Sequence, residues 1–356
     1  MLAPRPRSGA AVTSSKNPRQ SDIARRAGVS QATVSLVLTG RAAASRIPEA
    51  TQERIREAMV ELDYVPNAAA RSLRGGRNNL IGVHTFEPVF PVSPEDYYHE
   101  FLNGIEEEAV RAGLDLVLFA STQRPDGTRS IYGGGSNRLR LADGAIIFGF
   151  EKNDDELRRL SGEGYPFVFI GHREIPGVSI PYVTANYTDA MAPVVDLLVS
   201  AGHGDVAYFA VPARGLPQRE RLDGFRLAAT AAGLGVRVIE GAPSALDAHR
   251  VAEVFAAGAT ALVAETYELA RALQASLDEL GLDPASNVTA VSLDSDPRGD
   301  VFSHVHVPRR EMGRRAVSLL LGVIAGDAGP DTVDTVDCEP PTPETVRAPS
   351  AVVAPR

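Results

Sequence analysis

Residues 21–40 (SDIARRAGVSQATVSLVLTG) constrain the fold most, because they carry the pattern of two short helices joined at a glycine. Gly28 ends the first helix, since glycine adopts the left-handed conformation that other residues avoid. Ser30 is placed to cap the start of the second helix through its hydroxyl oxygen. The pattern fits both a helix-turn-helix that docks on DNA and an ordinary helical hairpin.

The flanking residues complete a small helical domain. Asn17 and Pro18 predict the start of the first helix, as an N-cap and a first-turn proline. A third helix is expected over residues 48–63, where Ile55 and Leu62 recur on one face. The second helix keeps polar side chains that can reach base edges or phosphates, namely Gln31, Thr33, Ser35 and Thr39.

Residues 64–74 (YVPNAAARSLR) predict a further helix of about two turns, capped by Asn67 and ended by two glycines. Helices this short are marginal in water, and three alanines with Leu73 give it little to pack on. We therefore expect it to order only against a partner. Arg71 and Arg74 indicate phosphate, and Leu73 suits a wedge between base steps in the minor groove. A flexible linker is the alternative.

The charge distribution agrees with a DNA-binding head. Residues 1–78 hold 13 Lys and Arg against 6 Asp and Glu, a net charge of +7, whereas the whole chain stands at −9. A basic head on an acidic body directs non-specific contact with DNA to one end and makes that affinity depend steeply on salt. Residues 1–16 lack an apolar segment and are expected to form a disordered tail, not a signal peptide.

In this region the chain resembles the lactose/galactose repressor family of bacterial regulators. The matching residues are Asp22-Ile23-Ala24, Ala27-Gly28-Val29-Ser30, Ala32-Thr33-Val34-Ser35, Val37-Leu38, Tyr64-x-Pro66-Asn67, Ala70-Arg71-Ser72-Leu73-Arg74 and Ile81-Gly82-Val83. The resemblance implies a homodimer whose second helices enter two major-groove half-sites of a palindromic operator. It also implies that the short helices over residues 64–74 meet in the minor groove and insert Leu73.

The resemblance implies roles for single residues of the head. It places Gln31, Ala32 and Leu36 where the family reads bases. It places Ser30, Thr33 and Ser35 where the family touches phosphate, and it extends the interface over Thr39, Asn67, Ala70, Arg71, Leu73 and Arg74. Leu36 departs from the long polar residue common at its position, so it either contacts a thymine methyl group or packs inward.

The remainder of the chain alternates short apolar runs with amphipathic helices, which is typical of parallel, doubly wound sheets. Strands are expected over 80–85, 114–120, 144–148, 167–170, 206–210, 236–239, 261–264 and 288–293. Helices are expected over 95–112, 154–163, 188–201, 219–233, 245–257, 267–281 and 309–325. Residues 344–350 are expected to return as an edge strand.

The expected fold is α/β, an all-α helix-turn-helix head followed by a two-lobed effector domain like periplasmic sugar-binding proteins. The expected divisions are a tail (1–16), the head (17–63), a hinge (64–78) and the effector and dimerisation domain (79–350). The resemblance implies that one lobe holds residues 79–180 and 306–337, and the other 181–305 and 338–350.

Ligands of open α/β sheets bind at the carboxyl ends of the strands. The candidate effector-binding residues there are Phe86, Phe148, His172, Arg221, Glu265, Thr266 and Asp294. The resemblance gives Arg221 the guanidinium that grips the effector and Asp294 the carboxylate that takes sugar hydroxyls. Both residues also suit a structural ion pair, and Phe86 and His172 also suit the core.

The pair Glu265-Thr266 departs from the family, which usually places an Asn-Asp or similar pair there. Thr266 can still cap the following helix, but an amide is lost and a carboxylate is gained. The effector is accordingly a carbohydrate or a similar polyol, an unusual or basic molecule, or absent altogether.

Enzymatic patterns are missing from the sequence. The glycines at 133–135 lack GxGxxG spacing, and neither a GxxxxGK[ST] loop nor a GxSxG elbow occurs. His304 and His306 have no third ligand placed near them, so neither a metal nor a cofactor is expected. The single Cys338 fits a reducing cytoplasm and an inert role, and no apolar run reaches the length of a membrane span.

The sequence thus predicts a cytoplasmic, homodimeric regulator, most simply a repressor, that binds double-stranded operator DNA under control of a small molecule. One alternative is a DNA-binding regulator without an effector, either constitutive or controlled by a protein partner. A transport-type sugar-binding protein is disfavoured, because the chain has the head and no signal peptide. Residues after Cys338 hold no leucine heptads, so a dimer is expected instead of a tail-assembled tetramer.

Overall fold

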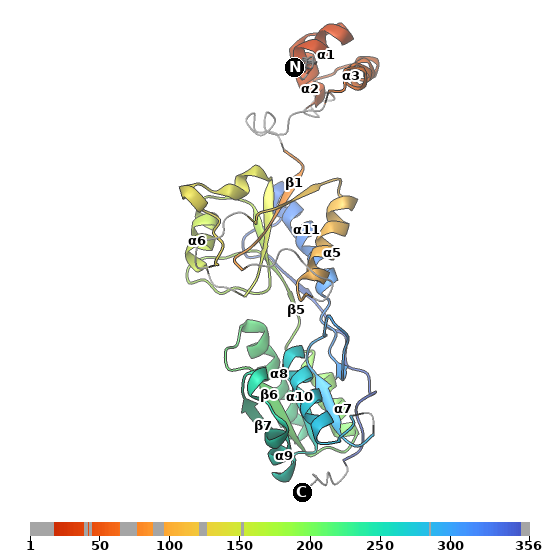
Figure 1. Ribbon diagram of the computed structural model, residues 1–356. Helices are drawn as coiled ribbons and strands as arrows, with labels where there is room; N and C mark the ends of the chain where they lie inside the picture. Colours follow the sequence, from red (N-terminus) through yellow and green to blue (C-terminus); the bar gives the residue numbers. More distant parts are fainter. Residues whose placement is uncertain are drawn as a thin grey trace, which may run out of the picture. The chain divides into compact units, whose positions relative to one another are not determined.

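The computed structural model describes residues 18–38, 42, 45–64, 77–87, 96–120, 127–150, 153–284 and 286–349. The chain divides into two compact units, Met1–Asn78 and Asn79–Arg356, which are described separately (Figure 1).

The first unit is a three-helix head made of α1 (Gln20–Ala27), α2 (Gln31–Leu38) and α3 (Glu49–Glu61). Its core is formed by small and branched apolar side chains, Ile23, Ala24, Ala27, Val34, Ile55 and Ala58. Gly28 ends α1 with a φ of 67°, as expected. The start of α1 differs from the prediction: Arg19, not Asn17, is the N-cap, because the Asp22 carboxylate accepts the Arg19 backbone N–H at 2.9 Å.

The second unit begins with a first lobe built on a six-stranded parallel sheet in the order β11-β5-β4-β3-β1-β2. Its strands are β1 (Leu80–Thr85), β2 (Asp115–Leu118), β3 (Gly144–Phe148), β4 (Phe167–Ile170), β5 (Tyr182–Ala185) and β11 (Val333–Val336). Its helices are α5 (His99–Arg111), α6 (Asp154–Gly162), α11 (Arg309–Ala325) and two 3₁₀ turns, η1 (Gly133–Gly135) and η2 (Arg138–Leu141).

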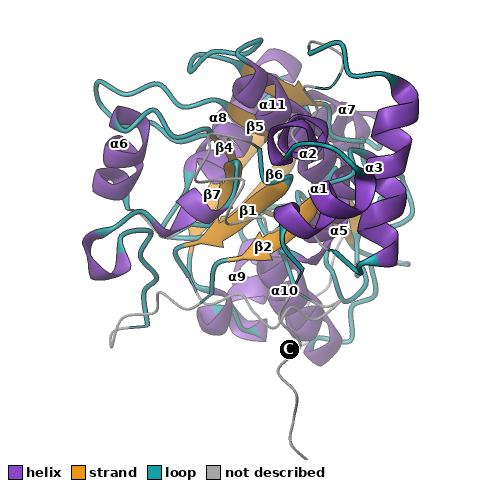
Figure 2. Ribbon diagram, turned by 90° about the horizontal axis from the view of Figure 1, so that it is seen from above, coloured by secondary structure: helices purple, strands orange, loops and turns teal. Residues whose placement is uncertain are grey.

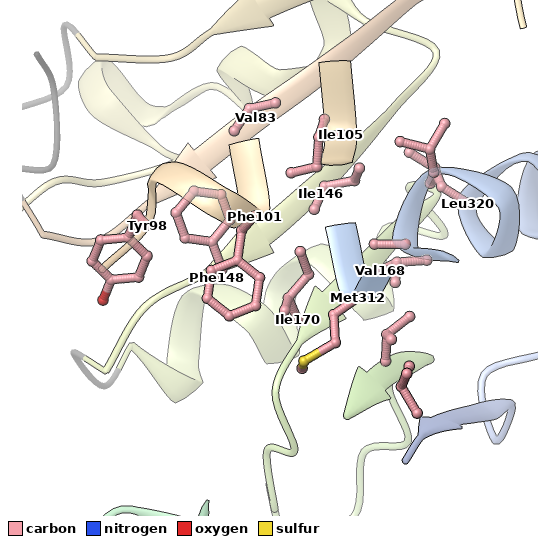
Figure 3. Packing of buried hydrophobic residues seen from close by; sticks show 14 of the residues in the cluster. Val83, Tyr98, Phe101, Ile105, Ile146, Phe148, Val168, Ile170, Met312 and Leu320 are labelled. Atoms are coloured by element: carbon pink, nitrogen blue, oxygen red, sulfur yellow. The ribbon is translucent and has the colours of Figure 1, made fainter. Parts of the chain in front are cut away.

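Alternation along the strands divides the side chains of the first lobe between two cores. Residues such as Val83, Ile146 and Val168 face α5 and α11 (Figure 3). The intervening residues, such as Ile147 and Phe169, face the side that α6 covers. Both faces of the central strands are therefore buried, which is why β3 and β4 are continuously apolar.

The second lobe is a five-stranded parallel sheet in the order β10-β9-β8-β6-β7. Its strands are β6 (Asp205–Ala210), β7 (Gly235–Glu240), β8 (Ala261–Ala264), β9 (Thr289–Ser292) and β10 (Ser303–His304). Two helices, α7 (Met191–Ser200) and α8 (Leu216–Ala232), pack on one face of this sheet. Two others, α9 (Ala248–Ala256) and α10 (Tyr267–Glu279), pack on the other (Figure 2). The 3₁₀ turn η3 (Pro243–Ala245) precedes α9 in the chain.

The structure corrects two boundaries. β5 pairs with β4 in the first sheet, so the chain leaves the first lobe after Ala185 and not near residue 180. The segment that begins at residue 344 is not a strand over its described residues. Thr345 contacts the second lobe through hydrogen bonds to Ala290 and Ser303, and Arg347 through hydrogen bonds to Thr289. None of the described helices is long and apolar enough to cross a membrane.

Candidate functional site

The exposed face of α2 carries the residues expected to contact DNA. Ser30 caps the helix: its Oγ accepts the backbone N–H of Thr33 at 3.1 Å. Gln31 and Ala32 are exposed beside it, whereas Val34 turns into the core of the head. The start of α2 therefore offers side chains and a positive helix end to an anionic partner.

The structure describes only some of the other residues that are expected to contact DNA. Thr33, Ser35 and Leu36 are half-buried along α2. Thr39, Asn67, Ala70, Arg71, Leu73 and Arg74 lie outside the described residues.

A cavity of about 240 Å³ lies between the strand ends of the first lobe and the start of α8 in the second, and we call it the large cavity only in contrast to a smaller one beside it. Its walls are dominated by aromatic rings, Tyr97, Tyr98, Phe101, Phe148, Phe150, Phe169 and Tyr187. His172, Arg173, Glu174, Arg214 and Arg219 add polar groups at its rim. Of the expected site residues, Phe148 and His172 line this cavity.

A second cavity of about 100 Å³, the small cavity, shares Tyr97, Phe150 and Pro217 with the large one. Three of the expected site residues line it, Arg221, Thr266 and Asp294. Thr266 also caps α10, as expected, and its hydroxyl accepts the backbone N–H of Leu269.

The most buried charges of the site gather on Asp294. Nη2 of Arg221 lies 3.6 Å from Asp294 Oδ1, and Nη2 of Arg309 donates to the same oxygen. Tyrosine rings cover both guanidinium groups, with Arg309 4.4 Å from the centre of Tyr97 and Arg221 4.8 Å from that of Tyr187. Arg221 and Asp294 thus form the ion pair that was the alternative to a ligand role, in a cluster of three residues that also lines the small cavity through these two.

Glu265 does not take the place expected of it. Its carboxylate lies 2.9 Å from the backbone nitrogen of Val211, 3.2 Å from the Tyr208 hydroxyl and 3.6 Å from Nε of Arg214. It is fully buried and lines neither cavity. Burial raises its pKa, and the Val211 N–H and Arg214 oppose that rise. Glu265 is therefore a structural group, and its carboxylate gives no support for a basic effector.

Phe86 was wrongly predicted as a site residue. Only 2% of its surface is exposed, its ring centre lies 5.0 Å from that of His84, and it packs with Phe119 and Ile131 in the core beside α6. The alternative, that an aromatic residue at a strand end belongs to the core, is correct here.

His172 bridges the lobes at the edge of the large cavity. Its ring stacks on Tyr182 at 4.6 Å, and its Nδ1 lies 3.7 Å from a carboxylate oxygen of Glu220 in α8. It therefore links the end of β4 to α8, the elements on either side of the cavity.

Tyr97, Tyr187 and Arg309 belong to the candidate site but were not predicted from the sequence. Tyr187 follows β5, a strand that was not predicted, and Tyr97 precedes α5. Arg309 lies in a basic run at the start of α11, where nothing marks it out from Arg310.

Other candidate groups stay outside the site. His304 and His306 have ring centres 6.5 Å apart, and no group of three His, Cys, Asp or Glu in the described segments is arranged to hold a metal ion. Cys338 packs against the cores of both lobes, and burial raises the pKa of its thiol to about 11.

Two family models match the chain. "Bacterial regulatory proteins, lacI family" covers residues 21–67, and "Periplasmic binding proteins and sugar binding domain of LacI family" covers residues 87–335, well over half of the chain. The protein belongs to the LacI family of bacterial regulatory proteins.

Particular relatives cover the chain to different extents. It is 26% identical over 324 residues to the HTH-type transcriptional repressor PurR of Vibrio parahaemolyticus, which covers 84% of this chain and 90% of that protein. It is 28% identical over 225 residues to catabolite control protein A of Priestia megaterium, where the match spans 64% of the relative, slightly less than two thirds. The sucrose operon repressor of Klebsiella pneumoniae is 32% identical over 220 residues, 61% of this chain and 62% of that protein.

Solved structures share the fold. The lac repressor dimer bound to operator and the anti-inducer ONPF has a TM-score of 0.70 at 22% identity, covering 94% of this chain and all of that one. The complex of the transcriptional regulator CelR with cellobiose has a TM-score of 0.61 at 22% identity over the same share of this chain.

Proposed function

We propose that this protein is a cytoplasmic transcriptional repressor that binds a palindromic operator as a homodimer and responds to a small molecule in its interlobe cavities. The observation that carries the proposal is the presence, in one chain, of a helix-turn-helix head and of a 240 Å³ cavity lined by both lobes of the body. Its role is binding and not catalysis.

The head supports the DNA-binding part of the proposal. Gln31 and Ala32 are exposed at the capped start of α2, which is the part of a recognition helix that contacts base edges. Two copies related by a twofold axis would present two such helices to the half-sites of a palindrome. A lac repressor dimer bound to operator is among the structures that share the fold.

The cavities support the effector part of the proposal. Aromatic rings such as Tyr97 and Phe148 suit the faces of a sugar ring, while Arg221 and Asp294 offer planar polar groups for its substituents. Carbohydrate ligands or operons appear in the names of relatives, including a CelR–cellobiose complex and a sucrose operon repressor.

A change in the angle between the lobes would couple the two functions. We propose that the ligand alters the spacing of the two segments around Leu73 and so stabilises or melts the short helix that the sequence predicts over residues 64–74. A coupling free energy of about 1–3 kcal/mol changes operator affinity by roughly 5- to 150-fold. Leu73→Ala should then weaken specific binding while leaving its dependence on salt nearly unchanged.

The test is a sequence-selection binding assay with the full chain on random duplex DNA. The proposal predicts an enriched palindrome with two half-sites and a deformable central step. Recovery of no sequence above a salt-sensitive background would contradict it. If wild type and Leu73→Ala bind the selected duplex with equal affinity, Leu73 does not act as a wedge between base steps.

A further inference from the structure

Two buried guanidinium groups share one carboxylate where the two lobes meet. Arg309 is the first residue of α11 in the first lobe, and Arg221 lies in α8 of the second. They are 6% and 2% exposed, and Asp294, to which both turn, is 4% exposed. Since both arginines approach the same Oδ1 atom, a single negative charge faces two positive ones.

No second carboxylate lies within ion-pair distance of either guanidinium in the part of the chain that is described. The backbone carbonyl of Glu265 accepts from Arg221, but the Glu265 carboxylate is held by Arg214, which also pairs with the exposed Glu240 at 2.8 Å. Burial raises the pKa of Glu265 as well, which favours its neutral form. The cluster around Asp294 is therefore left with an excess positive charge.

A buried charge without a counter-charge is strongly unfavourable. The Nε atoms of Arg221 and Arg309 also lack a hydrogen-bond partner within the described residues. The rings of Tyr97 and Tyr187 attract the two cations but do not neutralise them. The cluster thus has both the charge and the free donors to bind an anion.

The small cavity provides the space for that anion. Arg221 lines it, and so does Thr266 at the N-terminus of α10, where the helix dipole favours negative charge. Glu268 also lines it, but this side chain is exposed, so solvent screens its charge. The small cavity shares a wall with the large one, so its polar residues lie next to the aromatic rings that line the large cavity.

We infer that the effector carries an anionic group, a carboxylate or a phosphate on a sugar-sized polyol, and that Arg221, which lines the small cavity, binds this group while Arg309 stays paired with Asp294. The inference rests on the proposed function, because it names the class of ligand for the same cavities. Arg221 and Arg309 both turn to Oδ1 of Asp294, so an anion in the cavity competes with this carboxylate for Arg221. An entering anion takes over Arg221 and leaves Asp294 to Arg309, the closer of its two partners.

The first test uses inorganic phosphate as the probe. The midpoint of thermal unfolding of the full chain is measured in sodium phosphate and in sodium chloride of equal ionic strength. Phosphate should raise the midpoint saturably in wild type, because a ligand that binds only the folded state stabilises it. Arg309→Gln should lower the affinity about 10- to 100-fold, because Arg221 is then needed to balance the buried charge of Asp294.

Arg310→Gln is the matched control. Arg310 is the next residue of α11, but it is exposed and pairs with Glu107 on α5. This variant should keep the response to phosphate. An equal effect of chloride and phosphate in wild type, or an unchanged response in Arg309→Gln, would overturn the inference.

The second test compares glucose, glucuronate and glucose 6-phosphate by calorimetry on the full chain. At least one anionic compound should bind ten times or more tightly than glucose, and the comparison separates a carboxylate from a phosphate preference. Tighter binding of glucose would overturn the anionic effector and leave the proposed function standing. Failure to select an operator would contradict the proposed function and leave anion binding untouched.

For the Asp294→Asn variant, an anion site and a site for neutral sugars predict changes in ligand affinity of opposite sign. If Asp294 competes with the ligand for Arg221, its loss should raise the affinity for phosphate. If it accepts sugar hydroxyls, its loss should lower the affinity for the ligand. Should this variant fail to fold, Arg309→Gln still decides, because it leaves Arg221 and Asp294 as a balanced pair.

Discussion

Gly104 and Gly313 bring α5 and α11 together at backbone contact distance. A Cβ atom on Gly104 would lie 1.9 Å from the carbonyl oxygen of Arg310, and one on Gly313 would lie 2.3 Å from that of Phe101. Only hydrogen fits at these positions. The contact fixes the start of α11, and with it the position of Arg309 against Asp294.

Gly104→Ala should therefore destabilise the body by about 1–3 kcal/mol, the range for forcing an extra methyl group into a packed interior. Gly162→Ala is the control, because a Cβ atom there meets nothing within 4 Å at the end of α6. Urea unfolding of both variants and of wild type measures the difference. Equal midpoints for the two variants would show that α5 and α11 can separate freely.

Ser30 should contribute to the stability of the head through its cap. Ser30→Ala removes the acceptor of the Thr33 N–H and should cost about 1 kcal/mol of head stability. Ser30→Asp should retain the cap, since aspartate is an equally good N-cap residue. Thermal unfolding of the head followed by circular dichroism checks both, with Ser21→Ala, an exposed position in α1, as the control. A loss as large in Ser21→Ala would argue against a special role for Ser30.

His84 should make the body sensitive to acid. Burial lowers the pKa of His84 to about 4, helped by Arg129 and opposed by the Phe119 backbone. The folded state therefore favours neutral His84. The protein has its full stability above pH 6.5 and loses stability as the pH drops toward 4, because the unfolded chain then binds the proton more readily. The loss amounts to about 3 kcal/mol, at 1.36 kcal/mol per pKa unit.

The measurement is the free energy of unfolding of the full chain between pH 7 and pH 4. His84→Asn should flatten this dependence, whereas His249→Asn should not, since His249 is exposed on α9. A curve of the same slope in wild type and His84→Asn would locate the acid sensitivity elsewhere.

Cys338 should react slowly with thiol reagents in the native protein. The thiolate is the reactive form, and a pKa raised to about 11 by burial leaves very little of it at pH 8. Alkylation should accelerate by roughly two orders of magnitude in denaturant, as the pKa returns toward about 8.5. Cys338 is the only cysteine of the chain, so the rate can be assigned to it directly. A native rate close to the denatured one would contradict its burial between the cores of the lobes.

Much of the fold could be predicted because its central strands carry continuous apolar runs. Four strands have the bounds that the apolar runs predicted: β1 (80–85), β3 (144–148), β4 (167–170) and β8 (261–264). β5 (YVTA) and β11 (VDTV) were missed, since each has only four residues with polar side chains among them. Their strand conformation comes from pairing with each other, which is a contact over long sequence separation.

The candidate site was less predictable, for a geometric reason. A sequence can place Glu265 at the end of β8, but it cannot say that its side chain turns to Tyr208 on the neighbouring strand. Likewise, Arg309 meets Asp294 only because α11 of the first lobe begins beside the end of β9 of the second. Arg221 and Asp294 were predictable through resemblance alone.

The central claim is that occupancy of the cavities in the body sets the affinity of the head for its operator. The most direct measurement is the dissociation constant of the full chain for the selected duplex at fixed salt, with and without a compound shown by calorimetry to bind. The account predicts a change of roughly 5- to 150-fold in either direction, which Arg309→Gln reduces and Arg310→Gln preserves. An unchanged dissociation constant when the compound saturates the protein would contradict it.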